Sequence, residues 1–137
     1  MTSYKQWSGP TREARFREYK AARAAGDIPR PGPCEICGQT EGTMHHAEDY
    51  GPILEAYFAA LHSVCGRCHA MLHCRFRFPG QWAAYKQKCR TEGAQPKVKN
   101  MGDVYYGLTR DVPLKTYPEG SSWWELLSPT RYTGPLL

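Results

Sequence analysis

The stretch CGRCHAMLH, residues 65–73, places two cysteines and two histidines within nine positions of the chain. Cys65 and Cys68 form a C-x-x-C pair, and Cys34 and Cys37 form another. Each C-x-x-C turn aims two thiolates at one point, and two such turns complete the tetrahedron that zinc prefers. The spacing predicts a structural Zn²⁺ held by four thiolates, which leave no open position for water or substrate.

The histidines of the same region indicate a second metal. His69 and His73 stand four residues apart, so on a helix both imidazoles lie on one face and can bind a single ion. The insertion between the cysteine pairs carries a second histidine pair, His45 and His46. Since four thiolates fill the first site, we expect a second site made by His69, His73 and one histidine of the pair. The alternative is a mixed structural site in which a histidine replaces a cysteine, but that leaves the adjacent histidines difficult to explain.

Length and composition bound the class of protein. The chain has 137 residues, the size of one ordinary domain. No stretch approaches the roughly 20 apolar residues of a membrane span, and the first residues, MTSYKQWSGPTREARFREYK, lack the apolar block of a signal peptide. We therefore expect a cytoplasmic protein without a membrane partner, in which the cysteines stay reduced and serve as metal ligands.

Charge is distributed unevenly along the chain, although the formal net charge is only +5. Residues 1–33 carry seven Lys or Arg and three acids, and residues 74–99 carry seven and one. Between them, residues 34–73 carry one basic residue and five acids. This pattern suits a polyanion held by the flanks and presented to a cation in the middle. Solvated helices that simply carry Lys and Arg are the alternative, and a pI of 8.9 does not decide between them.

Helix-forming composition and stop signals divide the chain into predicted elements. Pro10 and Thr11 predict a helix entrance, and Gly26 predicts its end. The proline-rich run at 28–33 cannot continue a helix and is expected to be extended. The other predicted elements are a knuckle turn and hairpin over 34–52, a short helix over 53–64, and helices over 69–78 and 81–93.

The last third of the chain differs from the rest in amino-acid composition. From about Ala94 it is rich in Pro, Gly and aromatic residues without clear periodicity, and it is too aromatic to be disordered by composition. We expect this tail to pack on its own domain, with a second subunit, another protein or a nucleic acid as alternative partners. The predicted division is a basic helical arm over 1–33, a central domain with a basic helical extension over 34–93, and the tail over 94–137. Its aromatic residues are Tyr105, Tyr106, Tyr117, Trp123, Trp124 and Tyr132.

Taken together, a C-x-x-C knuckle, a histidine pair and C-x-x-C-H-x-x-x-H resemble the HNH branch of the His-Me finger nucleases. The HH and H-x-x-x-H elements are particularly similar to those of colicin-type DNases, and HHAEDYGPILEA is similar to small phage-encoded HNH-like proteins. The resemblance covers residues 34–73. It implies an α+β fold with a small, zinc-braced ββα-metal core, flanking helices and an irregular aromatic C-terminal tail. The implied activity is metal-dependent endonuclease cleavage of DNA.

The resemblance also implies roles for the histidines. His46 would be the general base that activates the attacking water, and His45 would join His69 and His73 in holding the catalytic metal. Imidazole accepts a proton near neutral pH, while a cation on the phosphate stabilises the developing charge. Three imidazoles favour Zn, Ni, Mn or Co over Mg. Glu48 and Asp49 would soften that preference, although a solvated hairpin tip is the expected position for both acids.

The chain departs from the family pattern at the central asparagine. In the family this residue fastens the loop that carries the base, and here it should fall near Ala60, yet the only asparagine is Asn100. His62 or Ser63 would have to supply a substitute hydrogen bond.

Two further readings therefore remain beside the nuclease. One is a non-cleaving zinc module that binds nucleic acid or a protein. The other is a structural or inhibitory protein of a mobile element, with the tail as its interaction surface, including a homodimer contact. Under the nuclease reading, basic side chains near the site would contact DNA phosphates, giving affinity with little sequence information. These candidates are Arg67, Arg75, Arg77, Lys86, Lys88 and Arg90.

Overall fold

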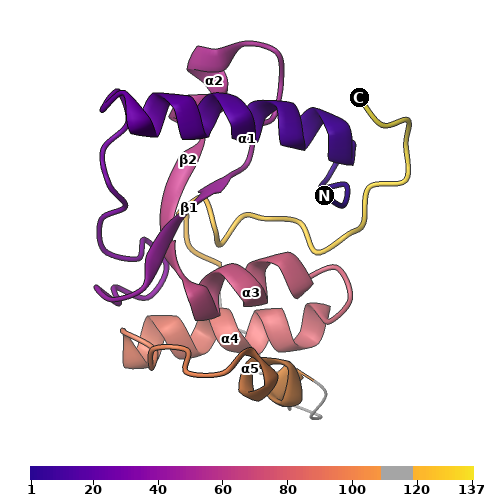
Figure 1. Cartoon of the computed structure of the whole chain (residues 1–137). Helices are drawn as coiled ribbons and strands as arrows, with labels where there is room; N and C mark the ends of the chain where they lie inside the picture. The colour runs from indigo at the N-terminus through magenta and orange to yellow at the C-terminus, as the bar shows by residue number, and fades with distance from the viewer. Residues whose placement is uncertain (109–118) are drawn as a thin grey trace. The chain divides into compact units, whose positions relative to one another are not determined.

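A computed structural model describes residues 1–108 and 119–137, apart from the side chains of residues 103, 106 and 107. The fold is α+β, as predicted: helices accompany a small sheet of two antiparallel strands. The elements in chain order (Figure 1) are α1 (Gly9–Ala24), β1 (Thr43–Ala47), α2 (Leu54–Ala59), β2 (Leu61–Cys65), α3 (Gly66–Cys74), α4 (Pro79–Glu92) and α5 (Met101–Leu108).

The first helix has the caps that its sequence predicts. Ser8 is the N-cap, and its side chain accepts a hydrogen bond from the Thr11 N–H at 3.3 Å. Pro10 lies in the first turn, where its missing N–H costs nothing. The helix ends at Ala24, just before Gly26, whose φ of +80° lies in the left-handed region that glycine adopts readily. The predicted helix is confirmed.

The sheet differs from the predicted hairpin. β1 lies within the stretch expected to form the hairpin, but its partner is β2, which follows α2. The helix expected over 53–64 ends at Ala59, and the chain then becomes extended at Leu61. Pairing with β1 satisfies the main-chain groups of β2, and this long-range contact outweighs the local helix preference of its residues. The predicted helix is therefore wrong in its second half.

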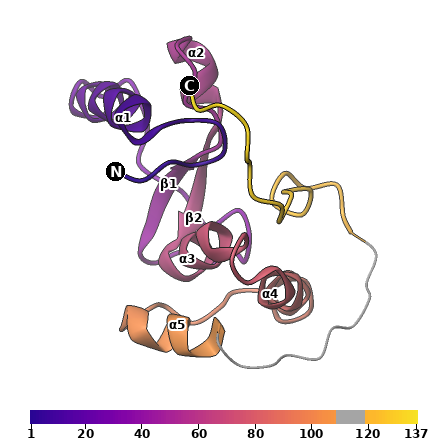
Figure 2. The ribbon, with the colours of Figure 1, turned by 90° about the vertical axis from the view of Figure 1, so that its right-hand side faces the viewer.

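Helix α3 follows β2 without a loop (Figure 1). It starts at Gly66, three residues earlier than predicted, because the Cys65 thiol caps it by accepting from the Cys68 N–H at 3.5 Å. The helix predicted over 81–93 is confirmed as α4. Both α4 and α5 pack against α3 (Figure 2). Helix α5 lies in the tail, where the sequence predicts no regular element.

The chain, expected from its length to be one domain, divides into two compact units. Unit 1 comprises residues 1–31, 45–62 and 131–137, and unit 2 comprises residues 32–44 and 63–130. The division does not follow the predicted segments 1–33, 34–93 and 94–137, because both strands of the sheet run from one unit into the other.

The core of unit 1 is largely aromatic. Tyr4, Trp7, Tyr50 and Tyr57 are all buried. The Arg12 guanidinium lies 5.5 Å from the ring centre of Tyr4 and 5.0 Å from that of Tyr50, so its charge is covered by two aromatic faces. Helix α2 packs on α1 within this unit.

Part of the aromatic tail belongs to the core of unit 2. Trp124 is buried, and the Glu125 carboxylate accepts hydrogen bonds from Arg90 at 2.6 Å and from the Gly120 N–H at 2.7 Å. The Glu125 carbonyl accepts from Lys86 at 3.1 Å. Residues 119–130 thus pack on their own chain, as expected for the tail from the sequence. Tyr117 lies outside the described residues.

Among the helices within residues 1–108 and 119–137, none has both the length and the apolar character needed to cross a lipid bilayer.

Candidate metal centre

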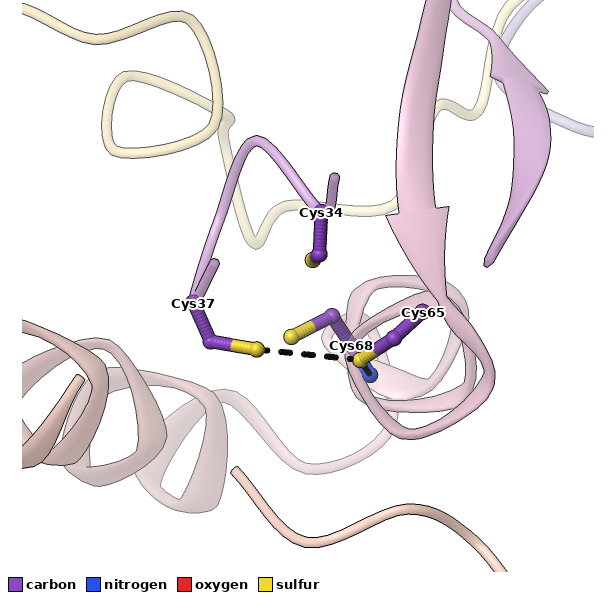
Figure 3. A group of neighbouring side chains, drawn as sticks. All are labelled: Cys34, Cys37, Cys65 and Cys68. Atoms are coloured by element: carbon purple, nitrogen blue, oxygen red, sulfur yellow. Dashed lines mark hydrogen bonds between the residues drawn. The ribbon is translucent and has the colours of Figure 1, made fainter. Parts of the chain in front are cut away.

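Four cysteines of unit 2 converge on one point. Figure 3 shows Cys34 and Cys37 on a loop, Cys65 at the end of β2 and Cys68 in the first turn of α3. The four residues are buried, and their sulfur atoms all lie within 4.8 Å of one another. Ligands about 2.3 Å from the centre of a tetrahedron are about 3.8 Å apart. The Cys37 and Cys65 sulfurs are 3.8 Å apart, so this group could hold a metal such as zinc.

Local hydrogen bonds build the loop that carries the first pair. The Cys34 N–H donates to the Gln39 carbonyl, and the Gly38 N–H donates to the Cys34 carbonyl, both at 2.8 Å. Gly38 has a φ of +87°, a conformation that a residue with a side chain rarely adopts. This tight turn brings both thiols to the same side of the loop.

Two hydrogen bonds between Glu35 and Ser63 tie this loop to β2. The Glu35 N–H donates to the Ser63 carbonyl at 2.8 Å, and the Glu35 carboxylate accepts from the Ser63 N–H at 2.6 Å. The Ser63 hydroxyl accepts from the Gly32 N–H at 3.0 Å. The side chain of Ser63, expected as a substitute for the asparagine, is therefore engaged at the cysteine loop instead.

Hydrogen bonds link the thiols of Cys34, Cys65 and Cys68 and shift their pKa values in opposite directions. Hydrogen bonds from Cys65 and Cys68 hold the pKa of Cys34 far below its ordinary value. The hydrogen bond to Cys34 in turn raises the pKa of Cys65 to about 12, and the same interactions raise that of Cys68. One thiolate is thus stabilised by protons on its neighbours. Binding of zinc must displace these protons, so its affinity is expected to fall as the pH is lowered.

A tyrosine of α4 supports the cysteine group from outside. The Tyr85 hydroxyl lies 2.9 Å from the Cys68 sulfur. Burial raises the pKa of Tyr85, and the neighbouring Cys68 and Cys89 raise it further, so the phenol stays protonated and can donate to a Cys68 thiolate. Donors of this kind orient a metal ligand and reduce its charge.

Tyr85→Phe removes this donor and leaves the ring in place. We expect zinc affinity to fall about tenfold or more, because loss of a group that supports a ligand typically costs 10- to 100-fold. Competition with a chromogenic chelator measures the affinity. Tyr105→Phe is the matched control, since Tyr105 is 51% exposed on α5. Equal affinities for the two variants would show that Tyr85 does not support the site.

The other two cysteines do not join this group. Cys89 is buried on α4 and interacts with Cys68, while Cys74 is half-buried at the end of α3. All six cysteines lie within the described residues and none forms a disulfide.

The histidines of α3 face each other, as their spacing predicts. His69 and His73 bring their Nε2 atoms to 2.9 Å, with the rings edge to face. Two imidazole nitrogens this close can both reach a single ion at the usual distance of about 2.1 Å. They project from the helix that begins at the second cysteine pair.

The adjacent histidines of β1 lie in unit 1 and have different partners, because successive side chains of a strand point to opposite faces. His45 Nδ1 is 2.8 Å from the Tyr19 hydroxyl of α1. His46 is buried, and its Nε2 is hydrogen-bonded to the Glu48 carboxylate. That carboxylate also accepts from the Tyr4 hydroxyl. The ligand set His45, His69 and His73 draws on both units and stays a prediction from the sequence.

Glu48 is not at a solvated tip, so that expectation is wrong for this residue. Its side chain is 14% exposed, and Lys5 Nζ lies 3.5 Å from its second oxygen. Burial would raise the pKa of Glu48, but the hydrogen bonds from His46 and Tyr4 and the charges of His46 and Lys5 outweigh it and lower the pKa to about 2. The neighbouring Asp49 accepts from the Gly51 N–H at 2.7 Å and closes the turn.

Glu48→Gln is expected to destabilise the protein at neutral pH. The folded pKa lies below the ordinary value of 4.5, so ionisation stabilises the fold above pH 4.5, and this contribution is lost as the pH falls toward 2. The loss at pH 7 should be on the order of 3 kcal/mol and should vanish near pH 2. Urea unfolding across this pH range measures it, with the exposed Glu55→Gln as control. A difference from wild type that does not change with pH would contradict the pairing.

A main-chain hydrogen bond lies where the resemblance places the asparagine. The Ala60 carbonyl accepts from the Glu48 N–H at 3.2 Å. Ala60 is the C-cap of α2, so this bond joins the end of that helix to the residues just after β1. His62, the other expected substitute, is half-buried in β2 and is not on a helix.

Two of the basic residues expected to contact phosphate are buried. Arg75 is 1% exposed and donates to the Leu72 carbonyl at 3.0 Å and the Ser128 carbonyl at 2.9 Å. Lys86 is 5% exposed and is bonded to Glu119 and to the Glu125 carbonyl. Their charges hold residues 119–128 in place, and neither side chain is accessible to a nucleic acid in this structure.

The other four basic candidates differ in whether their side chains are bonded to other residues of the chain. Arg67 Nε donates to the Pro96 carbonyl at 3.0 Å, and Arg90 is paired with Glu125. Arg77 and Lys88 are exposed. Burial separates Arg75 and Lys86 from these four residues, and the local sequence gives no sign of that difference.

Comparisons of the chain with models of known protein families, with curated proteins and with solved structures gave no match in any of the three.

Proposed function

We propose that this protein is a metal-dependent endonuclease of the HNH type that hydrolyses phosphodiester bonds of DNA. The observation that carries the proposal is the convergence of His69 and His73 on α3, with their Nε2 atoms 2.9 Å apart. This pair begins directly after Cys68, so a zinc held by the four cysteines would fix the helix that presents it. A rigid support of this kind is what a catalytic metal site needs.

The two metals have different roles under this proposal. The cysteine zinc braces the fold. A second divalent ion, Zn, Ni, Mn or Mg, is held by His69 and His73, with His45 assigned as the third ligand from the sequence motif alone. When bound, this ion polarises a phosphate oxygen and stabilises the charge that develops on the leaving oxygen.

His46 is the proposed general base. The ionised Glu48 carboxylate accepts a hydrogen bond from His46 Nε2, which fixes the orientation of the ring and makes Nδ1 the basic nitrogen of its neutral form. A base held in this way takes a proton from water with little reorganisation.

The missing asparagine has a substitute under this proposal. The Glu48 N–H bond to the Ala60 carbonyl fastens the end of β1, and the Glu48 carboxylate fastens the base itself. Both contacts lie in unit 1 and support the same residue that the asparagine would serve.

A non-cleaving zinc module that binds nucleic acid or a protein is the second candidate. The absence of the asparagine and the burial of Arg75 and Lys86 favour it. Such a module needs one tightly held zinc and no second ion.

A metal count on His73→Ala separates the two functions. For a nuclease we expect two metals per wild-type chain, one of them exchangeable, and one metal per chain in the variant, with cleavage lost. His62→Ala, which removes a histidine outside α3, is the control and should keep both metals. A single metal in wild type and variant alike would exclude the second site and leave the zinc module.

A further inference from the structure

One face of α1 combines aromatic rings with basic side chains. Phe16, Tyr19, Lys20 and Arg23 recur at the spacing that places residues on one side of a helix, and we call them the α1 stripe. The rings of Phe16 and Tyr19 stack with their centres 5.8 Å apart and an angle of 16° between their planes. Phe16 is 41% exposed.

Each ring of the stripe carries a cation. Lys20 Nζ lies 5.0 Å from the centre of the Phe16 ring. The Arg23 guanidinium lies 5.9 Å from the centre of the Tyr19 ring and donates to the Tyr19 hydroxyl at 3.1 Å. The stripe therefore combines two stacked aromatic rings with two flexible cationic side chains that lie over them.

The α1 stripe contacts His45, the first histidine of the pair on β1. The Tyr19 hydroxyl lies 2.8 Å from His45 Nδ1, and α1 and His45 both belong to unit 1. A ligand seated on Phe16 would therefore lie two stacked rings away from the strand that carries His45 and the proposed base.

Charge decides which partner fits this surface. Helix α1 carries five basic residues against two acids, Glu13 and Glu18. An apolar protein partner would bury the charges of Lys20 and Arg23 without counter-charges. A nucleic acid offers phosphates for the cations and bases for the aromatic rings. Phosphates pair with the cations, and a base stacks on the exposed ring. In a duplex the faces of the bases are already stacked on one another, so an exposed ring favours a single strand.

We propose that the α1 stripe binds a single-stranded segment of DNA, with one base stacked on Phe16 and adjacent phosphates paired with Lys20 and Arg23. This deepens the proposed function, because it gives the substrate an unpaired segment beside His45. Only the cleavage of the bound strand depends on the proposed nuclease function. The binding itself stands on the surface of α1.

Fluorescence anisotropy with a short labelled oligonucleotide tests the proposal. The full-length chain with His46→Gln, which fills the buried space and can donate to Glu48, serves as the parent, so that the probe is not cut. We expect tighter binding to the single strand than to a hairpin duplex of the same sequence. Phe16→Ala and Phe16→Leu should each weaken single-strand binding about fivefold or more, while Phe16→Tyr retains it. Ile53→Ala, which alters a residue of unit 1 that is 66% exposed, should have no effect.

A second pair of variants tests the phosphate contacts. Lys20→Ala should weaken binding and reduce its dependence on salt, since one fewer counterion is released. Arg30→Ala removes an exposed charge of unit 1 outside the stripe and should change both quantities less. Equal effects of the two variants would contradict a specific role for Lys20.

Other outcomes overturn the proposal without touching the nuclease. If Phe16→Ala and Phe16→Leu bind the single strand as the parent does, or if the duplex binds more tightly, α1 is not a single-strand surface. Binding to anionic phospholipid vesicles that depends on Phe16, with no binding to the oligonucleotide, would assign the stripe to a membrane. Conversely, a stripe that binds as expected in a chain that never cuts DNA would retain this inference and remove the nuclease.

Discussion

Cys65→Ser is expected to unfold unit 2 and to abolish the zinc binding predicted for its four cysteines. Cys65 ends β2, caps α3 through its sulfur and supplies one of the four converging thiols. Zinc bound by such groups contributes about 10–16 kcal/mol of apparent free energy, which is as large as the whole stability of a small domain. Loss of one thiolate should therefore remove most of the folding free energy of this unit.

Circular dichroism and a zinc assay measure this effect together. The variant should lose helical signal and zinc, and a strong chelator should do the same to the wild-type chain. Cys74→Ser is the matched control, because Cys74 is half-buried and lies outside the converging group. It should keep both fold and zinc. A Cys65→Ser chain that stays folded without zinc would show that the four-cysteine assignment is wrong.

His46→Ala is expected to reduce DNA cleavage by about 10²- to 10⁴-fold, the usual contribution of a general base. The side chain is buried, so removing it also leaves a cavity and deprives Glu48 of its partner. His46→Gln is therefore the more informative variant, since it fills the space and can donate to Glu48 but cannot act as a base at neutral pH.

Plasmid nicking at saturating metal measures the loss for both variants. Circular dichroism and the zinc content must match those of wild type for the comparison to hold. If folded His46→Gln cuts at the wild-type rate, another group is the base and the assignment of His46 is wrong.

The elements that could be predicted are those specified by local residues. The cysteine spacing predicts the converging thiols, since a C-x-x-C turn needs only a few residues to form. Ser8, Pro10 and Gly26 bound α1, and the i,i+4 spacing of two histidines predicts their approach on α3. Each cysteine pair, each end of α1 and the approach of the two histidines is decided within about one turn of chain, whereas the meeting of the two cysteine pairs depends on the contacts between Glu35 and Ser63.

The features that could not be predicted depend on contacts between distant residues. Leu61–Cys65 has a composition compatible with a helix and becomes a strand because β1 pairs with it. Glu48 has the sequence context of a turn, yet Tyr4, far away in the chain, encloses its carboxylate. Arg75 and Lys86 were expected to be accessible by composition alone, but residues 119–128 fold over them.

The most direct test of the nuclease is cleavage of supercoiled plasmid by the wild-type protein. The protein is first freed of exchangeable metal under conditions that leave the predicted cysteine zinc in place. Mn²⁺, Ni²⁺, Mg²⁺ and Zn²⁺ are added in turn, with His46→Gln alongside. The proposal predicts nicking that requires one of these ions and is lost in the variant. DNA that is retained by the protein but uncut with every metal would contradict the nuclease and identify a zinc-braced binding module.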